Sequence, residues 1–267
     1  DYYASRGLGD VYKRQTIYNR CGRSGLVLPR ISLGMWQNFG KNADYDTMKD
    51  IILTAFDHGI TYFDLANNYG PDPGQAEINF GKIFNENLKP YRDEIIIATK
   101  AGYEMWPGPY GGRGGSRKYL TASLDQSLKR MGIDYVDIFY HHCLDPDTPL
   151  KETALCMSDI VRQGKSLYIG MSNYDGKKMH RMYHKCDDYN VPFVVNQNRY
   201  NILDRQVEYN SLKKECFSKH KGLVAFSPLA QGRLSDKFRN GIPESSRLYG
   251  KPDYLSLIHI SEPTRRV

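Results

Sequence analysis

Short apolar runs alternate with segments of helical periodicity along most of this chain. Seven of the runs have the length and the β-branched or aromatic content of buried strands. They are Ile31–Trp36, Thr61–Asp64, Glu94–Thr99, Val136–His141, Ser166–Met171, Phe193–Gln197 and Leu223–Ser227. The segments with helical spacing are Tyr45–His58, Gln75–Asn87, Tyr119–Met131, Leu150–Gln163, Gly176–Asp187 and Asp204–His220. Regular alternation of strand and helix predicts a parallel sheet that is covered by helices.

The connections between these elements favour a barrel over an open sheet. The first expected strand is not followed by the glycine-rich motif that binds a dinucleotide in doubly wound sheets, so the predicted α/β fold is a (β/α)8 TIM barrel. Residues Tyr18–Leu28, with a turn at Gly22–Gly25, are predicted to form an N-terminal β-hairpin. The residues after Ser227 are polar and rich in glycine, proline and serine, so we expect the barrel to be truncated after about strand seven.

The two ends of the chain are related to each other in an unusual way. Residues 5–15 and 255–265 can be encoded by opposite strands of one DNA duplex: Gln15 as CAG pairs with Leu255 as CTG, and Lys13 as AAG pairs with Leu257 as CTT. The required codons resemble a transposase adapter that is used to build DNA sequencing libraries. We therefore expect residues 1–15 and 255–267 to be adapter-like, non-native segments, and residues 16–254 to form an incomplete barrel domain.

The composition is that of a globular protein. Of the 267 residues, 40% are hydrophobic and 25% are charged, and no run approaches the roughly 18 apolar residues that cross a bilayer. The five cysteines lack the spacing of a zinc site or of a disulfide framework, which predicts a reduced, cytoplasmic protein without a metal site. The net charge of +7 is dispersed and is carried in part by the terminal segments, so we expect neither a nucleic-acid partner nor a membrane partner.

Chemically active side chains follow three successive expected strands. Asp64 ends the second strand, and Tyr69 lies in the loop after it. Lys100 follows the third strand, and the pair His141–His142 follows the core of the fourth. Because side chains alternate along a strand, only one of the two histidines can face the mouth of a barrel. Each residue alone has an ordinary structural explanation, but an acid, a phenol, a lysine and an imidazole at one end of a barrel favour a catalytic site for proton transfer.

Several long runs resemble the aldo-keto reductase superfamily, whose members fold as (β/α)8 barrels. The runs are Tyr18–Leu26, Thr99–Tyr110, Ser123–Met131 and Phe226–Gly232, and the resemblance covers nearly all of residues 16–254. Within the superfamily these runs are most similar to the bacterial L-glyceraldehyde 3-phosphate reductase-like branch, which is related to the potassium-channel β subunits. The catalytic tetrad of the superfamily falls on Asp64, Tyr69, Lys100 and His142.

The resemblance implies a reaction in which NADPH reduces an aldehyde to an alcohol and Tyr69 acts as the general acid. The pKa of a free tyrosine is about 10, so we expect Lys100 to lower that of Tyr69 by roughly 2 to 3 units. Asp64 is expected to hold Lys100, and His142 to donate a hydrogen bond to the carbonyl oxygen of the substrate.

The same resemblance implies which residues bind the cofactor and the substrate. The expected cofactor-binding residues are Gly34, Met35, Trp36, Ser172, Asn173, Gln197, Phe226, Ser227, Leu229 and Gln231. The superfamily's clamp for the adenosine 2′-phosphate would lie beyond the eighth strand. The expected substrate residues are Trp36, Trp106, Tyr110, Arg113 and Arg117. The last two lie in the glycine-rich segment 108–118, which could bind a substrate phosphate or form a solvated loop.

The expected partner is a small-molecule carbonyl substrate, such as a phosphorylated short-chain aldehyde like glyceraldehyde 3-phosphate. A homo-oligomeric parent enzyme is an open alternative to a monomer. Two further functions also stay open at this point. One is a channel-β-like regulatory module, which would share the barrel and the tetrad, and the other is a nonfunctional fragment of a reductase gene.

Overall fold

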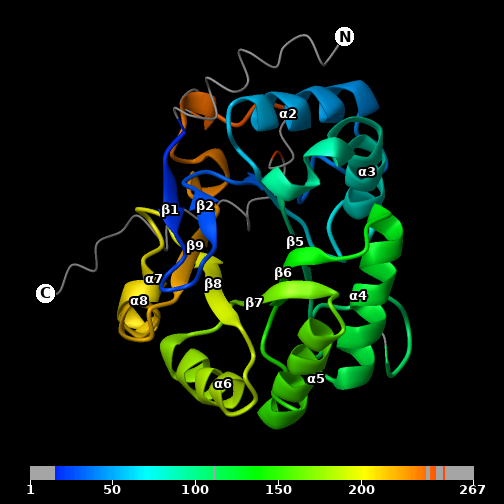
Figure 1. Cartoon of the computed structure of the whole chain (residues 1–267). Helices are drawn as coiled ribbons and strands as arrows, with labels where there is room; N and C mark the ends of the chain where they lie inside the picture. The colour runs from blue at the N-terminus through cyan, green and yellow to red at the C-terminus, as the bar shows by residue number, and fades with distance from the viewer. Residues whose placement is uncertain (1–15, 111, 239–240, 245–248, 250–267) are drawn as a thin grey trace, which may run out of the picture.

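A seven-stranded parallel sheet organises the molecule. The computed structural model describes residues 16–110, 112–238, 241–244 and 249. The strands are β3 (Leu33–Gly34), β4 (Tyr62–Asp64), β5 (Ile96–Ala101), β6 (Val136–His141), β7 (Ser166–Ser172), β8 (Phe193–Arg199) and β9 (Gly222–Phe226), and they pair in that order. Figure 1 shows the sheet curling, with the helices on its outside. The predicted (β/α) barrel architecture is therefore confirmed over these strands.

The helices between the strands begin and end where the sequence provides caps. They are α2 (Tyr45–Asp57), α3 (Gln75–Ile83), α4 (Arg117–Met131), α5 (Leu150–Arg162), α6 (Gly176–Asp188), α7 (Gln206–Tyr209) and α8 (Leu212–Ser218). The side chains of Asp44, Ser116 and Asp175 accept a hydrogen bond from the first turn of α2, α4 and α6 respectively. Gly132 ends α4 in the left-handed conformation, at φ 65°.

Two of the predicted elements differ from those observed. The expected helix Asp204–His220 is broken into α7 and α8 at Asn210–Ser211, where Ser211 has a φ of 67°. A backbone hydrogen bond from Gly176 to the Asn210 carbonyl holds this break against α6. The expected strand Glu94–Thr99 lies two residues later, as β5, because Lys89–Glu94 forms a short 3-10 helix, η3. Lys100 is consequently inside a strand and not after it.

Two further stretches are shorter than expected. The first expected strand, Ile31–Trp36, keeps only the two residues of β3. The expected helix Gln75–Asn87 changes from α3 to a π-helical turn, η2 (Phe84–Leu88). The short elements after β9 are η4 (Ala230–Gly232) and η5 (Asp236–Phe238).

A second, smaller cluster of buried side chains joins the strands to the hairpin. It consists of Tyr62, Ala98, Ile138, Tyr140, Val194 and Val195, together with Cys21 and Leu28 of the hairpin. The hairpin consists of β1 (Tyr18–Arg20) and β2 (Val27–Pro29), as predicted. The backbone N–H of Arg23 donates to His220, directly before β9, and the Tyr18 hydroxyl donates to Gly59, before β4. The hairpin therefore lies against the amino ends of the strands and does not cover their carboxyl ends.

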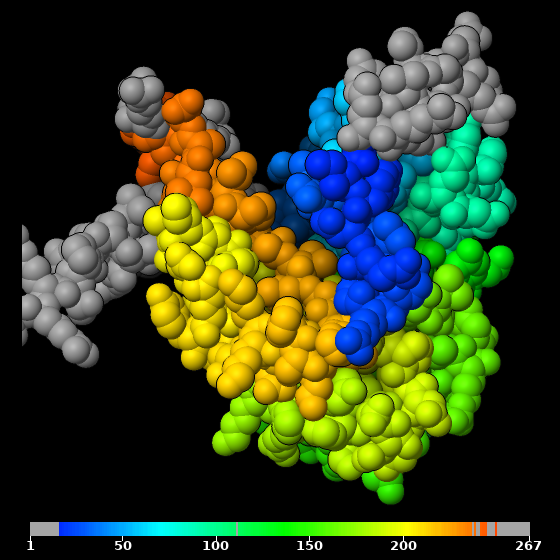
Figure 2. Space-filling view, turned by 60° about the vertical axis from the view of Figure 1, so that its left-hand side comes forward, coloured from blue at the N-terminus to red at the C-terminus, as the bar shows by residue number. Residues whose placement is uncertain are grey.

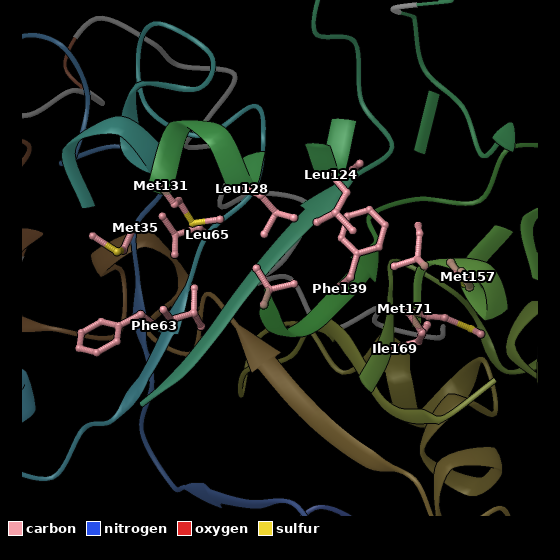
Figure 3. Packing of buried hydrophobic residues seen from close by; sticks show 14 of the residues in the cluster. Met35, Phe63, Leu65, Leu124, Leu128, Met131, Phe139, Met157, Ile169 and Met171 are labelled. Atoms are coloured by element: carbon pink, nitrogen blue, oxygen red, sulfur yellow. The ribbon is translucent and has the colours of Figure 1, made fainter. Parts of the chain in front are cut away.

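The larger apolar layer lies between the outer face of the sheet and the helices. Figure 3 shows Phe139 of the sheet near Leu124 of α4, with Phe63 near Met35 and Ile169 near Met171 in the same cluster. These side chains are buried, and burying each contributes on the order of 1.5 to 3 kcal/mol relative to leaving it exposed. This layer supplies much of the apolar burial that stabilises the fold. The residues that face into the curled sheet can therefore form a polar site.

The strands β3 and β9 form the two edges of the sheet within the described residues. In Figure 2 the surface is hollowed between the N-terminal segment in blue and the segment around β9 in orange. The adapter-like segments expected at 1–15 and 255–267 lie outside the described residues. Within the described part of the chain, no helix combines the length and the hydropathy that a membrane span requires.

Candidate active site

Lys100 is the centre of a buried polar cluster at the carboxyl ends of the strands. Its amine donates to Asp64 Oδ2 at 2.7 Å and to the Leu65 carbonyl oxygen at 2.7 Å. The side chain of Lys100 is fully buried, and that of Asp64 is 9% exposed. A buried ammonium without a partner would be unstable in this environment, so the carboxylate is what allows Lys100 to lie here.

Tyr69 and His142 complete the cluster. The Tyr69 hydroxyl lies 3.4 Å from the Lys100 amine, and the His142 ring packs edge-on against the Tyr69 ring, with 5.8 Å between centroids. As alternation predicts, the two histidines face opposite sides. His142 lies beside Tyr69, as the resemblance implied, whereas His141 hydrogen-bonds the Tyr174 hydroxyl at 2.6 Å. The structure thus brings together all four residues of the expected tetrad.

The floor of this cluster is made of two tyrosines and an amide. The hydroxyls of Tyr62 and Tyr140 lie 2.8 Å apart, and that of Tyr62 lies 3.5 Å from Asp64 Oδ1. Gln197 Nε2 donates to the same Asp64 oxygen at 3.0 Å. Asp64 is therefore oriented at Oδ1 by Gln197 of β8 and by Tyr62 of its own strand, and its Oδ2 is left to Lys100 of β5.

The electrostatics of the site differ in one respect from the expectation. Burial raises the pKa of Tyr69, and although Lys100 acts in the opposite direction as predicted, it does not outweigh burial. The expected net lowering of the Tyr69 pKa is therefore wrong for the site without bound ligands. Burial lowers the pKa of Lys100, but Asp64 and Tyr69 more than offset that effect and the pKa is raised. The site at neutral pH thus holds a charged ammonium beside a protonated phenol.

His142 is neutral under the same conditions. Burial lowers its pKa well below the usual value, and the charge of Lys100 adds to this effect. Its Nδ1 is buried and has no hydrogen-bond partner among the described residues. A neutral imidazole can donate one hydrogen bond without bringing a second positive charge beside Lys100.

The residues expected around a nicotinamide lie on neighbouring strands. Ser172 and Gln197 are register partners at the ends of β7 and β8, and Arg199 and Phe226 are partners on β8 and β9. The side-chain amide of Asn173, which has a φ of 59°, donates to the His142 carbonyl oxygen at 2.9 Å. These polar groups therefore adjoin the tetrad, as the binding of a reactive ring beside Tyr69 requires.

The loop after β9 contains three non-glycine residues in left-handed backbone conformations. Ser227 and Gln231 have positive φ values of 53° and 60°, and Ala230 between them has a φ of 47°. Left-handed conformations at non-glycine residues are costly and cluster at functional sites. In this loop Leu229 is 55% exposed, and Phe226 at its start is partly exposed with its ring near the Arg199 guanidinium. The backbone N–H groups of Ala230 and Gly232 donate within the loop, to the carbonyls of Ser227 and Leu229.

The remaining expected cofactor residues lie after β3. Gly34 is exposed, and a Cβ at this position would meet no atom within 4 Å, so a ligand has room to approach the backbone. Met35 is fully buried in the helix–sheet layer, so its side chain faces away from such a ligand. Trp36 is 46% exposed, and its ring lies 6.5 Å from that of Tyr69.

The expected substrate residues are only partly gathered by the structure. Trp36 adjoins Tyr69, as described above. Trp106 packs on Tyr119 of α4, and Tyr110 is 58% exposed. Arg117 forms a 2.5 Å ion pair with Asp159 of α5. The described contacts therefore assign Trp106 and Arg117 to packing and pairing around α4.

Tyr103 is a site residue that the sequence-based prediction missed. Its ring packs edge-on against His142, with 4.6 Å between centroids, and its hydroxyl lies 3.5 Å from Asn173 Nδ2. It also lies 5.6 Å beneath the guanidinium of Arg113. The signal that could have found it is its position, three residues after Lys100 and at the start of a loop on the carboxyl face of the barrel.

A parallel barrel with this set of proton-transfer groups at its carboxyl face is the arrangement of an enzyme that uses general acid–base catalysis. Comparison with known proteins makes the assignment specific. Residues 30–249 match the aldo/keto reductase family, and the chain belongs to this family.

Two relatives of this chain have different names, a reductase and a probable channel subunit. The chain is 52% identical over 235 residues to the L-glyceraldehyde 3-phosphate reductase of Escherichia coli O157:H7, which covers 88% of this chain and 68% of that protein. It is 35% identical over 249 residues to a probable voltage-gated potassium channel subunit beta of Arabidopsis thaliana, which covers 91% of this chain and 73% of that protein. The predicted relation to both groups is confirmed.

A solved structure supports the fold independently. The chain matches the thermostable aldo-keto reductase Tm1743, which was crystallised with the inhibitor epalrestat, with a TM-score of 0.70 and 34% identity. The match covers 83% of this chain and 76% of that chain. Among the described residues, no cluster of three metal-ligating side chains is present.

Proposed function

We propose that this protein uses NADPH to reduce a short-chain aldehyde, with a phosphorylated aldehyde such as glyceraldehyde 3-phosphate as its substrate class. The observation that carries the proposal is the contact between the Tyr69 hydroxyl and the buried Lys100–Asp64 pair. The name of the 52% identical Escherichia coli reductase supports the substrate class.

In the proposed reaction, each residue of the tetrad has one task. Tyr69 gives its hydroxyl proton to the carbonyl oxygen as the carbonyl becomes an alcohol. Lys100, 3.4 Å away, stabilises the phenolate that remains, and Asp64 fixes the position of Lys100. His142 donates a hydrogen bond to the same oxygen and orients it. The phenolate then recovers a proton from solvent.

NADPH would supply the hydride to the carbonyl carbon when it is bound. Ser172, Asn173 and Gln197 would hold its carboxamide, and Phe226 would pack on its nicotinamide ring. Ser227, Leu229 and Gln231 would bind the pyrophosphate, which the left-handed backbone of their loop supports. A raised Tyr69 pKa suits this reaction, because the acid must be protonated at neutral pH before it can donate.

The test is the conservative variant Tyr69→Phe, with Tyr45→Phe on the outer surface as its control. Removal of the Tyr69 hydroxyl is expected to lower kcat/KM for aldehyde reduction by about 10²-fold or more. The affinity for NADPH, measured by fluorescence titration, should stay within about threefold, and Tyr45→Phe should behave as the unmodified chain does. Near-normal turnover by Tyr69→Phe would exclude this residue as the acid.

The channel-β-like binding module is a second candidate, and the 35% identity to a probable channel subunit is the observation that favours it. Tight retention of NADPH together with very slow turnover of every aldehyde would support that function over the reductase. The five cysteines are free and buried, which accords with the cytoplasmic location that we propose for either function. The proposed reductase calls for neither a nucleic-acid nor a membrane partner, whereas a channel-β-like module would act by binding a membrane partner.

A further inference from the structure

We propose that Tyr103 and Arg113 form the subsite that recognises the anionic end of the substrate, with Tyr103 holding Arg113 over the mouth beside His142. This inference rests on the proposed function and deepens it. It assigns recognition of the phosphate to one arginine of the glycine-rich segment and excludes its neighbour Arg117.

Tyr103 links the catalytic residues to this cation. Its ring contacts the His142 ring edge-on at 78°, and its hydroxyl is in reach of Asn173. The Arg113 guanidinium lies over the same ring, and its pKa is raised by interaction with the Cys143 thiol, which directly follows His142. Arg113 is therefore one aromatic ring away from the imidazole that orients the carbonyl oxygen. The Tyr103 ring lies 4.6 Å from the His142 ring and 5.6 Å from the Arg113 guanidinium, so the proposed anion subsite adjoins the site of the carbonyl.

The two arginines of the segment differ in their partners. Arg113 takes part in none of the ion pairs found among the described residues, and its side chain is exposed. Arg117, in contrast, is paired with Asp159, and its backbone N–H is bound by Glu152. A cation that already has a carboxylate partner gains little from a phosphate. An arginine stacked on a tyrosine keeps its hydrogen-bond donors available at its edge.

The loop that carries Arg113 is anchored on both sides. Gly114 N–H donates to the Gly102 carbonyl at 3.1 Å, and Gly115 N–H donates to Asp145 Oδ2 at 2.8 Å. The carbonyl of Tyr103 accepts a hydrogen bond from the Tyr119 hydroxyl. These bonds fix both ends of the segment between Tyr103 and Arg113, so the stack is set by the backbone and not only by the side chains.

A binding measurement tests the subsite without any turnover. Glycerol 3-phosphate serves as a non-reducible probe, titrated by calorimetry into the full chain at low salt, with glycerol as the uncharged comparison. We expect Arg113→Gln and Tyr103→Leu each to raise the Kd of glycerol 3-phosphate by about 10- to 100-fold, the usual effect of losing a charge-assisted contact. Tyr103→Phe keeps the ring and should retain the affinity. The exposed control Arg162→Gln should have no effect.

The same variants separate the subsite from the reaction. With glyceraldehyde 3-phosphate, Arg113→Gln should raise KM far more than it lowers kcat, while kcat/KM for glyceraldehyde changes much less. If the two residues act as one unit, the double variant Tyr103→Leu/Arg113→Gln should lose little more than either single variant.

Three outcomes would overturn the inference. They are an unchanged Kd in Arg113→Gln, a loss of affinity in Arg117→Gln in place of Arg113→Gln, or an equal loss for the phosphorylated and the uncharged probe. Failure of the proposed function has a different signature: the unmodified chain would oxidise no NADPH with any aldehyde, whatever the binding measurement gives.

Discussion

The buried pair of Lys100 and Asp64 allows a quantitative prediction about stability that is independent of activity. In Lys100→Met, a side chain of similar length fills the same space but leaves the Asp64 carboxylate without its cation. Asp64 would keep only the hydrogen bonds at Oδ1 from Gln197, at 3.0 Å, and from Tyr62, at 3.5 Å. Removing one partner of a buried ion pair typically costs about 3 to 5 kcal/mol, and we expect a loss in this range.

The second arm of the experiment removes both charges. In Asp64→Asn/Lys100→Met no unpaired charge remains, so we expect the double variant to recover at least about 2 kcal/mol relative to Lys100→Met alone. The comparison that sets the scale is Lys165→Met, which breaks an ion pair with Asp125 in which the two side chains are 30% and 50% exposed. Such a surface pair contributes at most about 1 kcal/mol.

The assay is urea-induced unfolding at pH 7, followed by the fluorescence of the two tryptophans of the chain. Equal slopes against urea concentration for all variants are needed to compare their free energies of unfolding. The reasoning would be refuted if Lys100→Met cost no more than Lys165→Met. It would also be refuted if the double variant were no more stable than Lys100→Met, because the cost would then come from packing and not from the unpaired charge.

Two further predictions concern residues outside the proposed reaction. Burial lowers the pKa of His141 to about 4. Between pH 6.5 and 4 the unfolded chain therefore binds a proton that the folded chain does not. As the pH is lowered through this range, the free energy of unfolding should decrease by a total of about 3 kcal/mol through this residue. His141→Gln should show a shallower pH dependence in urea titrations at pH 7, 6 and 5, and an equal dependence would contradict the assignment. Gly170→Ala should destabilise the fold by about 1 to 3 kcal/mol, because a Cβ at Gly170 would lie 2.3 Å from the fully buried ring of Tyr140. Gly25→Ala, where the nearest atom is 3.9 Å away, is the matched control, and thermal unfolding should separate the two variants.

Much of the fold could be predicted from the sequence because the strands and helices differ in the period of their apolar residues. The same alternation predicted that only one of His141 and His142 faces the mouth, and the family resemblance indicated His142. The break at Ser211 could not be predicted in this way, because α7 and α8 both bury apolar residues and the interruption depends on a contact with α6. Local periodicity carries no information about such a contact.

The site was predicted less completely than the fold. Arg113 and Arg117 are indistinguishable by sequence, and only the pairing of Arg117 with Asp159, 42 residues away, separates them. The effect of Lys100 on the Tyr69 pKa was predicted in the right direction, but the stronger effect of burial depends on how the loop of Tyr69 closes over the strand ends. A pKa shift that is caused by burial can be read from the folded structure but not from the residue types.

The register of the sheet explains how strands place the charged residues Asp64 and Lys100, whereas a loop places Tyr69, the proposed general acid. Asp64 is the register partner of Ala98, and Lys100, two residues further along β5, is the partner of Tyr140. Lys100 therefore starts two residues nearer the mouth than Asp64, and its amine reaches back to the carboxylate. The backbone fixes this geometry, since strands are held by hydrogen bonds along their length. Tyr69, in contrast, is placed by loop contacts, among them the bond from Gly70 N–H to the Trp36 carbonyl at 2.8 Å. Changes in that loop should therefore impair proton transfer while the ion pair beneath it stays intact.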